Sequence, residues 1–157
     1  MTATGAIERP LSFAGNDIPG VMLAAAVRDY VVNFGVSPGD RTVVVTNNDD
    51  AYRTALTLKQ AGLEVPVILD ARAKGGGILM AEALAAGIRV ELGRGIAQVL
   101  GGKRVTGLQI CSQAGAGAVF ESIGCDVVAI SGGWSPVVHL WSPCCGKLNW
   151  DPDQGMF

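Results

Sequence analysis

The most constraining feature of the sequence is a strand–helix–strand pattern at residues 41–69. Residues 41–46 (RTVVVT) form a short β-branched run that predicts a buried strand. Apolar residues at helical spacing over 51–61 predict a helix, and the apolar run at 65–69 predicts a second buried strand. Apolar runs on both sides of a helix are typical of parallel strands covered on both faces. The pattern therefore predicts an α/β domain built on a parallel sheet.

Further elements are predicted on both sides of this unit. A helix is expected from Asp17, as its N-cap, to Phe34, with Gly35 closing it. Apolar runs around Gly101, Gly102 and Lys103 predict an antiparallel hairpin. The remaining expected elements are a helix at 78–86, strands at 88–92 and 126–130, and a tight loop at 131–136.

The composition excludes several classes of protein. Hydrophobic residues make up 49% and charged residues 17% of the 157 residues, which is too apolar for a disordered chain. A net charge of −2 gives no excess of positive charge of the kind that binds nucleic acid. No apolar run reaches the roughly 20 residues that a membrane-spanning helix needs, and no secretory signal is visible. We therefore expect a cytoplasmic protein that binds neither nucleic acid nor membrane.

The high apolar content permits two interpretations. One is a small α/β domain whose parallel strands are apolar on both faces. The other is a part of a larger protein, whose apolar surface contacts the rest of that protein. Residues 3–10 (ATGAIERP) favour the second, because they look like the end of a strand and its turn although no strand precedes them.

The turn at residues 46–50 (TNNDD) has unusual chemistry for a nucleotide site. Dinucleotide-binding turns carry GxGxxG, because glycines let the backbone approach a pyrophosphate at the helix N-terminus. This turn has no glycine, and Asp49 and Asp50 would repel a pyrophosphate, so conventional dinucleotide binding is expected to be lost. Asp70 holds the strand-end position of a ribose-binding acid, although an aspartate there is also typical of a turn cap. The incomplete glycine motif at 115–117 is interpreted as a connector.

A second candidate site follows the last predicted strand. Ser131, Gly132, Gly133 and Pro136 surround Trp134 in a segment whose glycines would let backbone lie against a ligand. The same segment is equally compatible with a tight turn that packs Trp134 in a core.

Neither histidine nor cysteine supplies an evident reactive centre. His139 is the only histidine, and its apolar neighbours favour structural or interface burial over a role as general base. The four cysteines include the adjacent pair Cys144 and Cys145 but no CxxC motif, so neither a zinc site nor a disulfide framework is indicated. We therefore assign no catalytic and no metal-ligating residue.

Five segments of the sequence carry a resemblance when they are taken together and in order. They are ATGAIERP at 3–10, FAGNDIPGVMLA at 13–24, VVVTNNDDAYRTAL at 43–56, VILDAR at 67–72 and ISGGWSPVVHLWS at 130–142. This combination resembles the α subunit of heterotetrameric sarcosine oxidases. Related amine dehydrogenases and opine or cyanide-forming oxidoreductases share this subunit architecture, so the α subunit of a related amine or opine dehydrogenase is an alternative.

The resemblance implies a fold and a division of the chain. In that family a dinucleotide-binding domain is interrupted by an inserted dinucleotide-like domain, as in the pyridine nucleotide-disulfide oxidoreductases. The expected fold is a Rossmann-like three-layer α/β domain with a parallel sheet plus an antiparallel β-hairpin or meander. Residues 1–18 would be the exit segment from the preceding domain, 19–126 the insert, and 127–157 the return strand and tail.

The resemblance also implies a reaction, partners and cofactors. The parent complex would demethylate sarcosine oxidatively to glycine and produce hydrogen peroxide, while the segment alone would be inactive. Its expected partners are the remainder of the α subunit and the β subunit. FAD and FMN would lie in the parent complex but not on this segment. NAD would be held in the α subunit and would contact this chain only at its rim, through Thr4 and Gly5 and through Ser131, Gly132, Gly133 and Pro136.

Three hypotheses for the chain itself follow. The first is a structural domain of a flavoprotein oxidoreductase, inert alone and adding a few contacts to NAD. The second is an autonomous nucleotide-binding module, in which Asn47 and Asn48 donate to phosphate oxygens and Asp70 lies at the strand end. A third is an interaction protein that associates through the apolar residues at 137–141.

Overall fold

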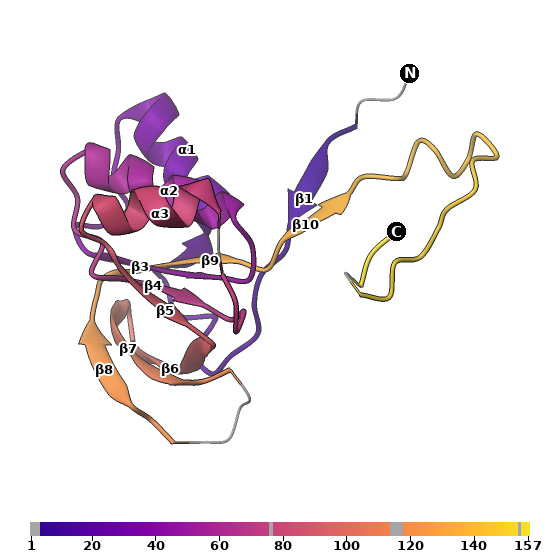
Figure 1. The fold of residues 1–157 in the computed structure, drawn as a ribbon. Helices are drawn as coiled ribbons and strands as arrows, with labels where there is room; N and C mark the ends of the chain where they lie inside the picture. The colour runs from indigo at the N-terminus through magenta and orange to yellow at the C-terminus, as the bar shows by residue number, and fades with distance from the viewer. Residues whose placement is uncertain (1–3, 76, 114–117, 154) are drawn as a thin grey trace.

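The computed structural model describes residues 4–75, 77–113, 118–153 and 155–157, and it shows three layers of secondary structure. Helices α1 (Ala24–Phe34), α2 (Asp50–Gln60) and α3 (Ile78–Ala85) cover one face of a parallel sheet. A second, antiparallel sheet covers the opposite face (Figure 1). This arrangement confirms the expected three-layer α/β fold.

The central sheet consists of five parallel strands in the order β2-β9-β3-β4-β5. Strand β9 pairs with both β2 and β3. The strand that comes last in the sequence of this sheet therefore lies between the two that come first. All five strands run the same way, and their carboxyl ends therefore meet at one edge. The strands are β2 (Val21–Leu23), β3 (Thr42–Thr46), β4 (Val67–Asp70), β5 (Arg89–Leu92) and β9 (Val127–Ser131).

The apolar run of β3 is explained by two hydrophobic cores, one on each face of the parallel sheet. Val44 packs in the core beneath the helices, whereas Val43 and Val45 pack in the core against the antiparallel sheet. Alternate side chains of a strand point to opposite faces, so a strand covered on both faces needs an apolar residue at every position. The strand predicted at 41–46 is thus confirmed.

The antiparallel sheet has the order β6-β7-β8, with β6 (Arg94–Gly101), β7 (Val105–Ser112) and β8 (Glu121–Gly124). The predicted hairpin is β6 and β7. Gly101 has a φ of 145°, and a Cβ there would lie 2.1 Å from the Arg104 carbonyl oxygen, so the turn requires glycine. Strand β8 was not predicted, because its sequence, ESIG, offers one large apolar residue and no clear alternation.

The helix expected from Asp17 begins only at Ala24. Residues 21–23 are instead strand β2, which pairs in parallel with β9, and Leu23 is extended with φ −64° and ψ 140°. A short apolar run fits a buried strand and a helix equally well, and the pairing partner decides between them. The predicted end of the helix is confirmed, because Gly35 is left-handed and donates to the Val31 carbonyl.

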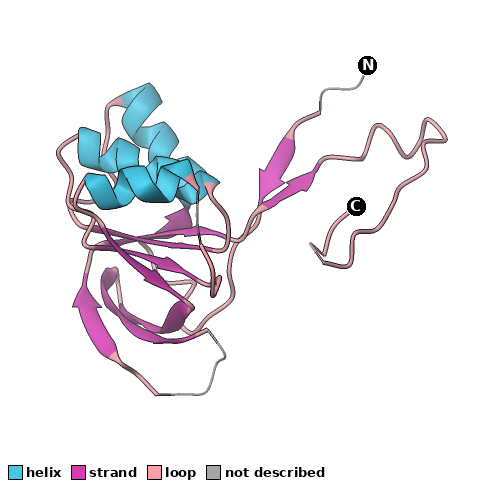
Figure 2. Ribbon diagram, viewed as in Figure 1, coloured by secondary structure: helices cyan, strands magenta, loops and turns pink. Residues whose placement is uncertain are grey.

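A separate two-stranded ribbon joins the two ends of the domain and leads away from its body (Figure 2). Strand β1 (Ala6–Glu8) pairs antiparallel with β10 (Trp134–Pro136). Of the tight loop expected at 131–136, only Gly132 and Gly133 lie outside strands, because Ser131 ends β9 and 134–136 form β10. The buried Glu8 carboxylate accepts a 2.9 Å hydrogen bond from the Ala25 amide, which ties the ribbon to the start of α1. Residues 137–153 and 155–157 continue beyond the ribbon, mostly as loop.

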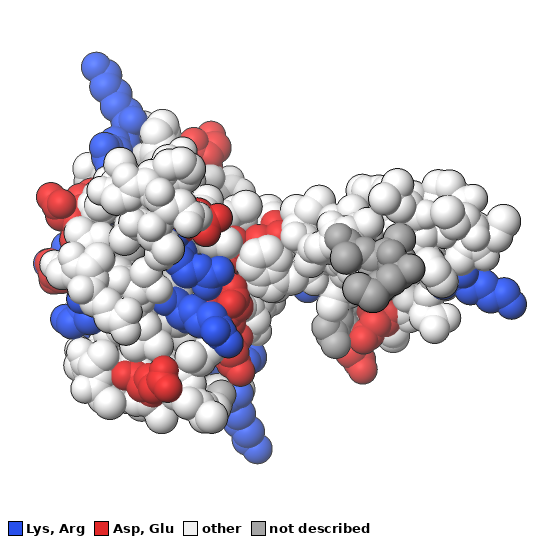
Figure 3. Space-filling model, turned by 90° about the horizontal axis from the view of Figure 1, so that it is seen from above, with Lys and Arg blue, Asp and Glu red and all other residues white. Residues whose placement is uncertain are grey.

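Charged side chains of both signs lie next to one another on the face shown in Figure 3. Charged side chains of the domain form ion pairs, among them Arg41 with Glu64 and Arg89 with Glu121, both at 2.8 Å. Within the described part of the chain, no helix has the length and apolar character needed to cross a bilayer.

Candidate functional site

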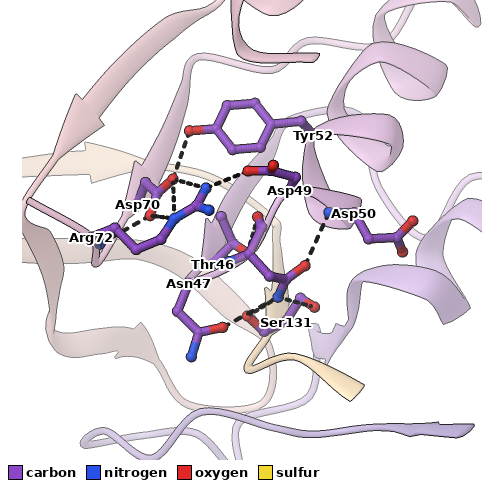
Figure 4. Close-up of polar contacts among 9 residues, drawn as sticks. Thr46, Asn47, Asp49, Asp50, Tyr52, Asp70, Arg72 and Ser131 are labelled. Atoms are coloured by element: carbon purple, nitrogen blue, oxygen red, sulfur yellow. Dashed lines mark hydrogen bonds and ion pairs between the residues drawn. The ribbon is translucent and has the colours of Figure 1, made fainter. Parts of the chain in front are cut away.

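The candidate site lies at the carboxyl edge of the parallel sheet, where three strands end side by side. Thr46 of β3 is in register with Asp70 of β4 on one side and with Ser131 of β9 on the other. All three residues are fully buried. The topology thus brings together two regions that the sequence separates by more than 80 positions, as Figure 4 shows.

The turn after β3 is organised by the side chain of Asn48. Its Nδ2 donates to the Ser131 hydroxyl at 3.0 Å and to the Ser131 carbonyl at 3.2 Å. Its Oδ1 accepts from the Asp50 amide at 3.0 Å, which is the first amide of α2. The Asn48 backbone amide donates to the Thr46 hydroxyl at 3.0 Å. Asn48, one residue before the N-cap Asp49, therefore closes the turn into α2 and fastens it to β9.

Next to this turn, Arg72 holds two carboxylates together. Its Nε lies 3.0 Å from Asp70 Oδ1, and its Nη2 lies 2.7 Å from Asp70 Oδ2 and 2.7 Å from Asp49 Oδ1. The Tyr52 hydroxyl donates to Asp70 Oδ2 at 2.8 Å. The Arg72 amide also donates to Asp70 Oδ1 at 3.0 Å. Asp70 is thus a buried charge whose two oxygens are both occupied by its own chain.

The electrostatics of the cluster keep its donors protonated. Burial, followed by the hydrogen bond to Asp70, raises the pKa of the Tyr52 hydroxyl above its ordinary value. The hydrogen bond to Asp70 raises the pKa of the already basic Arg72 guanidinium. Tyr52 and Arg72 therefore remain donors to Asp70 across the physiological pH range.

The carboxylates of the turn differ from their expected role as exposed repulsive charges. Asp49 is paired with Arg72, and Asp50 lies 3.5 Å from both Arg28 and Arg53. Repulsion of a pyrophosphate is therefore reduced by these cations. What stands in the way of a phosphate is that the Asp50 amide and the Arg72 guanidinium already have partners.

The residues expected at the NAD rim fall into two groups. In the first, Gly5 accepts at 3.0 Å from the Val137 amide, and the Thr4 hydroxyl donates to the Val137 carbonyl. Pro136 pairs with Ala6 across the ribbon. These contacts place Thr4, Gly5 and Pro136 at the far end of the ribbon, away from the edge of the sheet.

The second group, Ser131 to Gly133, lies where the ribbon meets the sheet. The Gly132 amide donates to the Arg9 carbonyl at 2.7 Å, and the Arg9 amide donates to the Gly133 carbonyl at 2.8 Å. A Cβ on Gly132 would lie 2.9 Å from the Pro10 carbonyl oxygen. Glycine at 132 therefore permits two chain segments to pass closely, as in the tight-turn interpretation.

One cavity of about 490 Å³ contains part of the predicted set. It is lined by Arg9, Asn47, Asn48, Gly133, Trp134, Asp153 and Met156. Asn47, Asn48 and Gly133 are therefore brought together. Asp70, Thr4, Gly5 and Pro136 are not among its lining residues.

Sequence reasoning missed Arg72, Tyr52 and Arg9. Arg72 directly follows the VILDA run, and its position two residues after Asp70 was an available signal for a carboxylate partner. Tyr52 lies 18 residues before Asp70, a separation at which no local pattern predicts a contact.

The remaining predictions have mixed outcomes. His139 is exposed in this chain, so the expected burial is not seen within it. Cys144 and Cys145 are exposed free thiols. The connector proposed at 115–117 lies outside the described residues. Among the residues described, no group of three His, Cys, Asp or Glu side chains is placed to hold a metal ion.

Sequence comparison confirms the resemblance to sarcosine oxidase α subunits. The chain is 36% identical over 163 residues to "Sarcosine oxidase subunit alpha" of Rhizobium meliloti (strain 1021), covering 100% of this chain and 15% of that protein. It is 43% identical over 156 residues to the protein of the same name from Corynebacterium sp. (strain P-1), covering 95% of this chain and 16% of that one. The chain thus spans a small part of the length of these relatives. No family model matches the sequence.

Solved structures show the same fold at low sequence identity. The match to thioredoxin reductase of T. acidophilum covers 94% of this chain and 47% of the reductase chain, with a TM-score of 0.71 and 15% sequence identity. An FAD-dependent pyridine nucleotide-disulphide oxidoreductase from Desulfovibrio vulgaris matches 99% of this chain and 43% of its own, with a TM-score of 0.68 and 16% identity. The Rossmann-like class expected from the sequence is confirmed.

Proposed function

Because the chain is homologous to a segment of sarcosine oxidase α subunits, we propose that it is a scaffold domain in the α subunit of such an oxidoreductase. The reaction of the whole protein would be the oxidative demethylation of sarcosine to glycine, with hydrogen peroxide as a product. The match of both relatives to at least 95% of the chain supports this assignment. The chain would contribute structure and no catalytic residue.

The observation that carries the scaffold role is the self-contained bonding at the start of α2. A helix N-terminus binds phosphate through free backbone amides. Here the Asn48 side chain accepts from the Asp50 amide, and the neighbouring Arg72 guanidinium is engaged by Asp49 and Asp70. A phosphate that used the Asp50 amide or the Arg72 guanidinium would have to displace these internal partners, and the turn has no glycine to bring backbone close to a pyrophosphate, which supports a scaffold role. The autonomous nucleotide-binding hypothesis, with Asn47, Asn48 and Asp70 as ligands, is correspondingly disfavoured.

A limited contact to NAD at the rim is compatible with the structure. The cavity of about 490 Å³ places Gly133, Asn47 and Arg9 around one space beside the ribbon. We propose that this space receives the edge of a dinucleotide whose main cradle is the preceding domain. Ser131 and Gly132 would then hold the backbone of the return strand in place, while Thr4, Gly5 and Pro136 would shape the ribbon. FAD and FMN would be bound elsewhere in the complex.

The division of the chain into an exit segment (1–18), an insert (19–126) and a return segment (127–157) is supported by the ribbon. Strands β1 and β10 pair with each other, so the chain enters and leaves the body of the domain side by side (Figure 1). Adjacent entry and exit strands are what an inserted domain requires. The proposed partners are the remainder of the α subunit and the β subunit. The four free cysteines fit a reducing, cytoplasmic location.

An NMR titration of the chain with NAD, and separately with ADP, tests this proposal. The scaffold role predicts no saturable shifts at Asn47, Asn48 or Asp70 with millimolar ADP. Shifts with NAD that are confined to the lining of the cavity beside the ribbon, including Arg9, Asn47, Gly133 and Trp134, would support the rim contact. Saturable shifts at Asp50 and Asp70 with either nucleotide would overturn the scaffold role.

A further inference from the structure

Two adjacent cysteines lie exposed in a turn that the proposed function does not use. Cys144 and Cys145 are free thiols in the segment at 139–145 that follows the ribbon. The other two cysteines are buried, with Cys111 8% and Cys125 5% exposed. Reagents in solution therefore meet only the adjacent pair, since accessibility is a main determinant of cysteine reactivity.

The backbone around the pair is held by hydrogen bonds on both sides. The Trp141 and Ser142 amides both donate to the Val138 carbonyl at 3.1 Å, and the Cys145 amide donates to the Ser142 carbonyl at 3.2 Å. The Gly146 amide donates to the Trp141 carbonyl at 3.1 Å. The two thiols are thus presented from a closed turn and not from a free tail.

The indole of Trp141 completes this turn. Its Nε1 donates to the Lys147 carbonyl at 3.1 Å. A Cβ on Gly146 would lie 2.2 Å from the indole ring, so the ring packs directly on the glycine that follows the cysteine pair. Trp141 is therefore a built-in reporter of the conformation at Cys145 and Gly146.

Cys145 is held in an uncommon conformation. Its φ is 61°, and within the described part of the chain it is the one residue other than glycine with a positive φ. A side-chain-bearing residue enters this region only where its surroundings impose it, and such positions cluster at functional sites. Here the surroundings are the hydrogen bonds that close the turn.

Adjacency makes a disulfide between the two cysteines unfavourable. Consecutive Cα atoms are about 3.8 Å apart, whereas disulfide-linked residues have Cα atoms roughly 4.4–6.8 Å apart. A direct S–S bond would therefore be strained and easily reduced. A ligand atom placed between the sulfurs relieves this constraint, because each sulfur then bonds to that atom and the two sulfurs stay further apart.

We propose that Cys144 and Cys145 form a bidentate dithiol site for soft metal and metalloid ions, which prefer sulfur ligands. The probe that matches this chemistry is phenylarsine oxide. In its reaction with the pair, two As–S bonds form and the As–O bond breaks. The oxygen leaves as water with the two thiol protons, and neither sulfur nor arsenic changes oxidation state. The proposal is independent of the sarcosine oxidase assignment.

Titration of the chain with phenylarsine oxide, followed by tryptophan fluorescence and intact mass, tests the site. One arsenical per chain is expected, with a change in the summed fluorescence of the three tryptophans, of which Trp141 adjoins the site. The single variants Cys144→Ser and Cys145→Ser should each bind about 100-fold more weakly, because losing one thiol removes the effective concentration that chelation supplies. Cys111→Ser is the matched control and should bind like the wild type.

Three results would overturn the site. The first is wild-type affinity in either single variant, which would show that one thiol suffices. The second is an adduct that maps to Cys111 or Cys125. The third is a chain that takes up no arsenical after mild reduction, with circular dichroism confirming that the wild type and variants are folded.

Discussion

Arg72 donates hydrogen bonds to the buried carboxylate of Asp70 from two nitrogens, from Nε to Oδ1 at 3.0 Å and from Nη2 to Oδ2 at 2.7 Å. The two residues are two positions apart in sequence, at the point where β4 ends. The same Nη2 reaches Asp49 at the start of α2, so a single guanidinium ties the helix to the edge of the sheet. This link lies beside the turn into α2, the turn that holds the pyrophosphate in dinucleotide-binding domains.

Removal of this guanidinium should destabilise the domain strongly. Arg72→Met leaves the Asp70 carboxylate buried with Tyr52 as its remaining side-chain partner, so the free energy of unfolding should fall by roughly 3 kcal/mol. Urea unfolding measures the change. Arg53→Met is the control, because Arg53 is largely exposed and its ion pair with Asp50 is long at 3.5 Å, so about 0.5 kcal/mol or less is expected. Equal losses in the two variants would contradict the special role of Arg72.

Loss of the Asn48 side chain should loosen both the turn and α2. Asn48→Ala removes the acceptor for the Asp50 amide and both donations to Ser131, for an expected loss of about 1–2 kcal/mol. Asn47→Ala is the neighbouring control, since the Asn47 side chain is exposed and bonds only within the turn. Chemical denaturation of the two variants measures the free energy of unfolding of each. The prediction fails if Asn47→Ala lowers that free energy as much as Asn48→Ala does.

The free energy of unfolding should decrease as the pH rises above 9. Burial, with a smaller effect of the Asp126 carboxylate, raises the pKa of the Cys125 thiol from 9.0 to about 12. Above pH 9 the unfolded chain loses this proton while the folded chain keeps it, so the folded state binds more protons and the free energy of unfolding decreases as pH rises. Between pH 9 and pH 10.5 the decrease should be roughly 1–2 kcal/mol.

Comparison with Cys125→Ala isolates this effect, because the variant lacks the titrating thiol. Urea unfolding at pH 7, 9 and 10.5 should give a shallower decline for the variant than for the wild type. Parallel pH profiles for the two proteins would refute the assignment to Cys125.

Removing the turn carboxylates should not create a nucleotide site. In Asp49→Ser/Asp50→Gly, Asn48 still fills the start of α2 and Arg72 is still held by Asp70. Isothermal titration with ADP should therefore show no saturable binding at millimolar concentration, as in the wild type. A gain in affinity of about tenfold or more would mean that charge repulsion, and not internal bonding, closes the site.

Local patterns were sufficient for the elements whose signals lie within a few residues. The run of valines in β3 reports burial on both faces, and the spacing of apolar residues in α2 reports one buried face. Gly35 marks a helix end because its left-handed conformation suits glycine. The hairpin at Gly101 depends on a similar local requirement.

The elements that were wrong or missed depend on partners far away in sequence. Val21 to Leu23 form a strand only because β9, more than 100 residues later, supplies hydrogen bonds to them. The pairing of β1 with β10 and the approach of Asn48 to Ser131 likewise depend on segments that are far apart in the sequence.

The sequence by itself thus determined the fold class and the layered α/β core, because hydrophobic periodicity is a local property of the chain. Only the tertiary structure decided that Arg72 joins Asp49 to Asp70 and that Asn48 reaches Ser131. Hydrogen-bond geometry acts over about 3 Å, and no spacing in a linear sequence specifies which distant groups the folded sheet will bring within that distance.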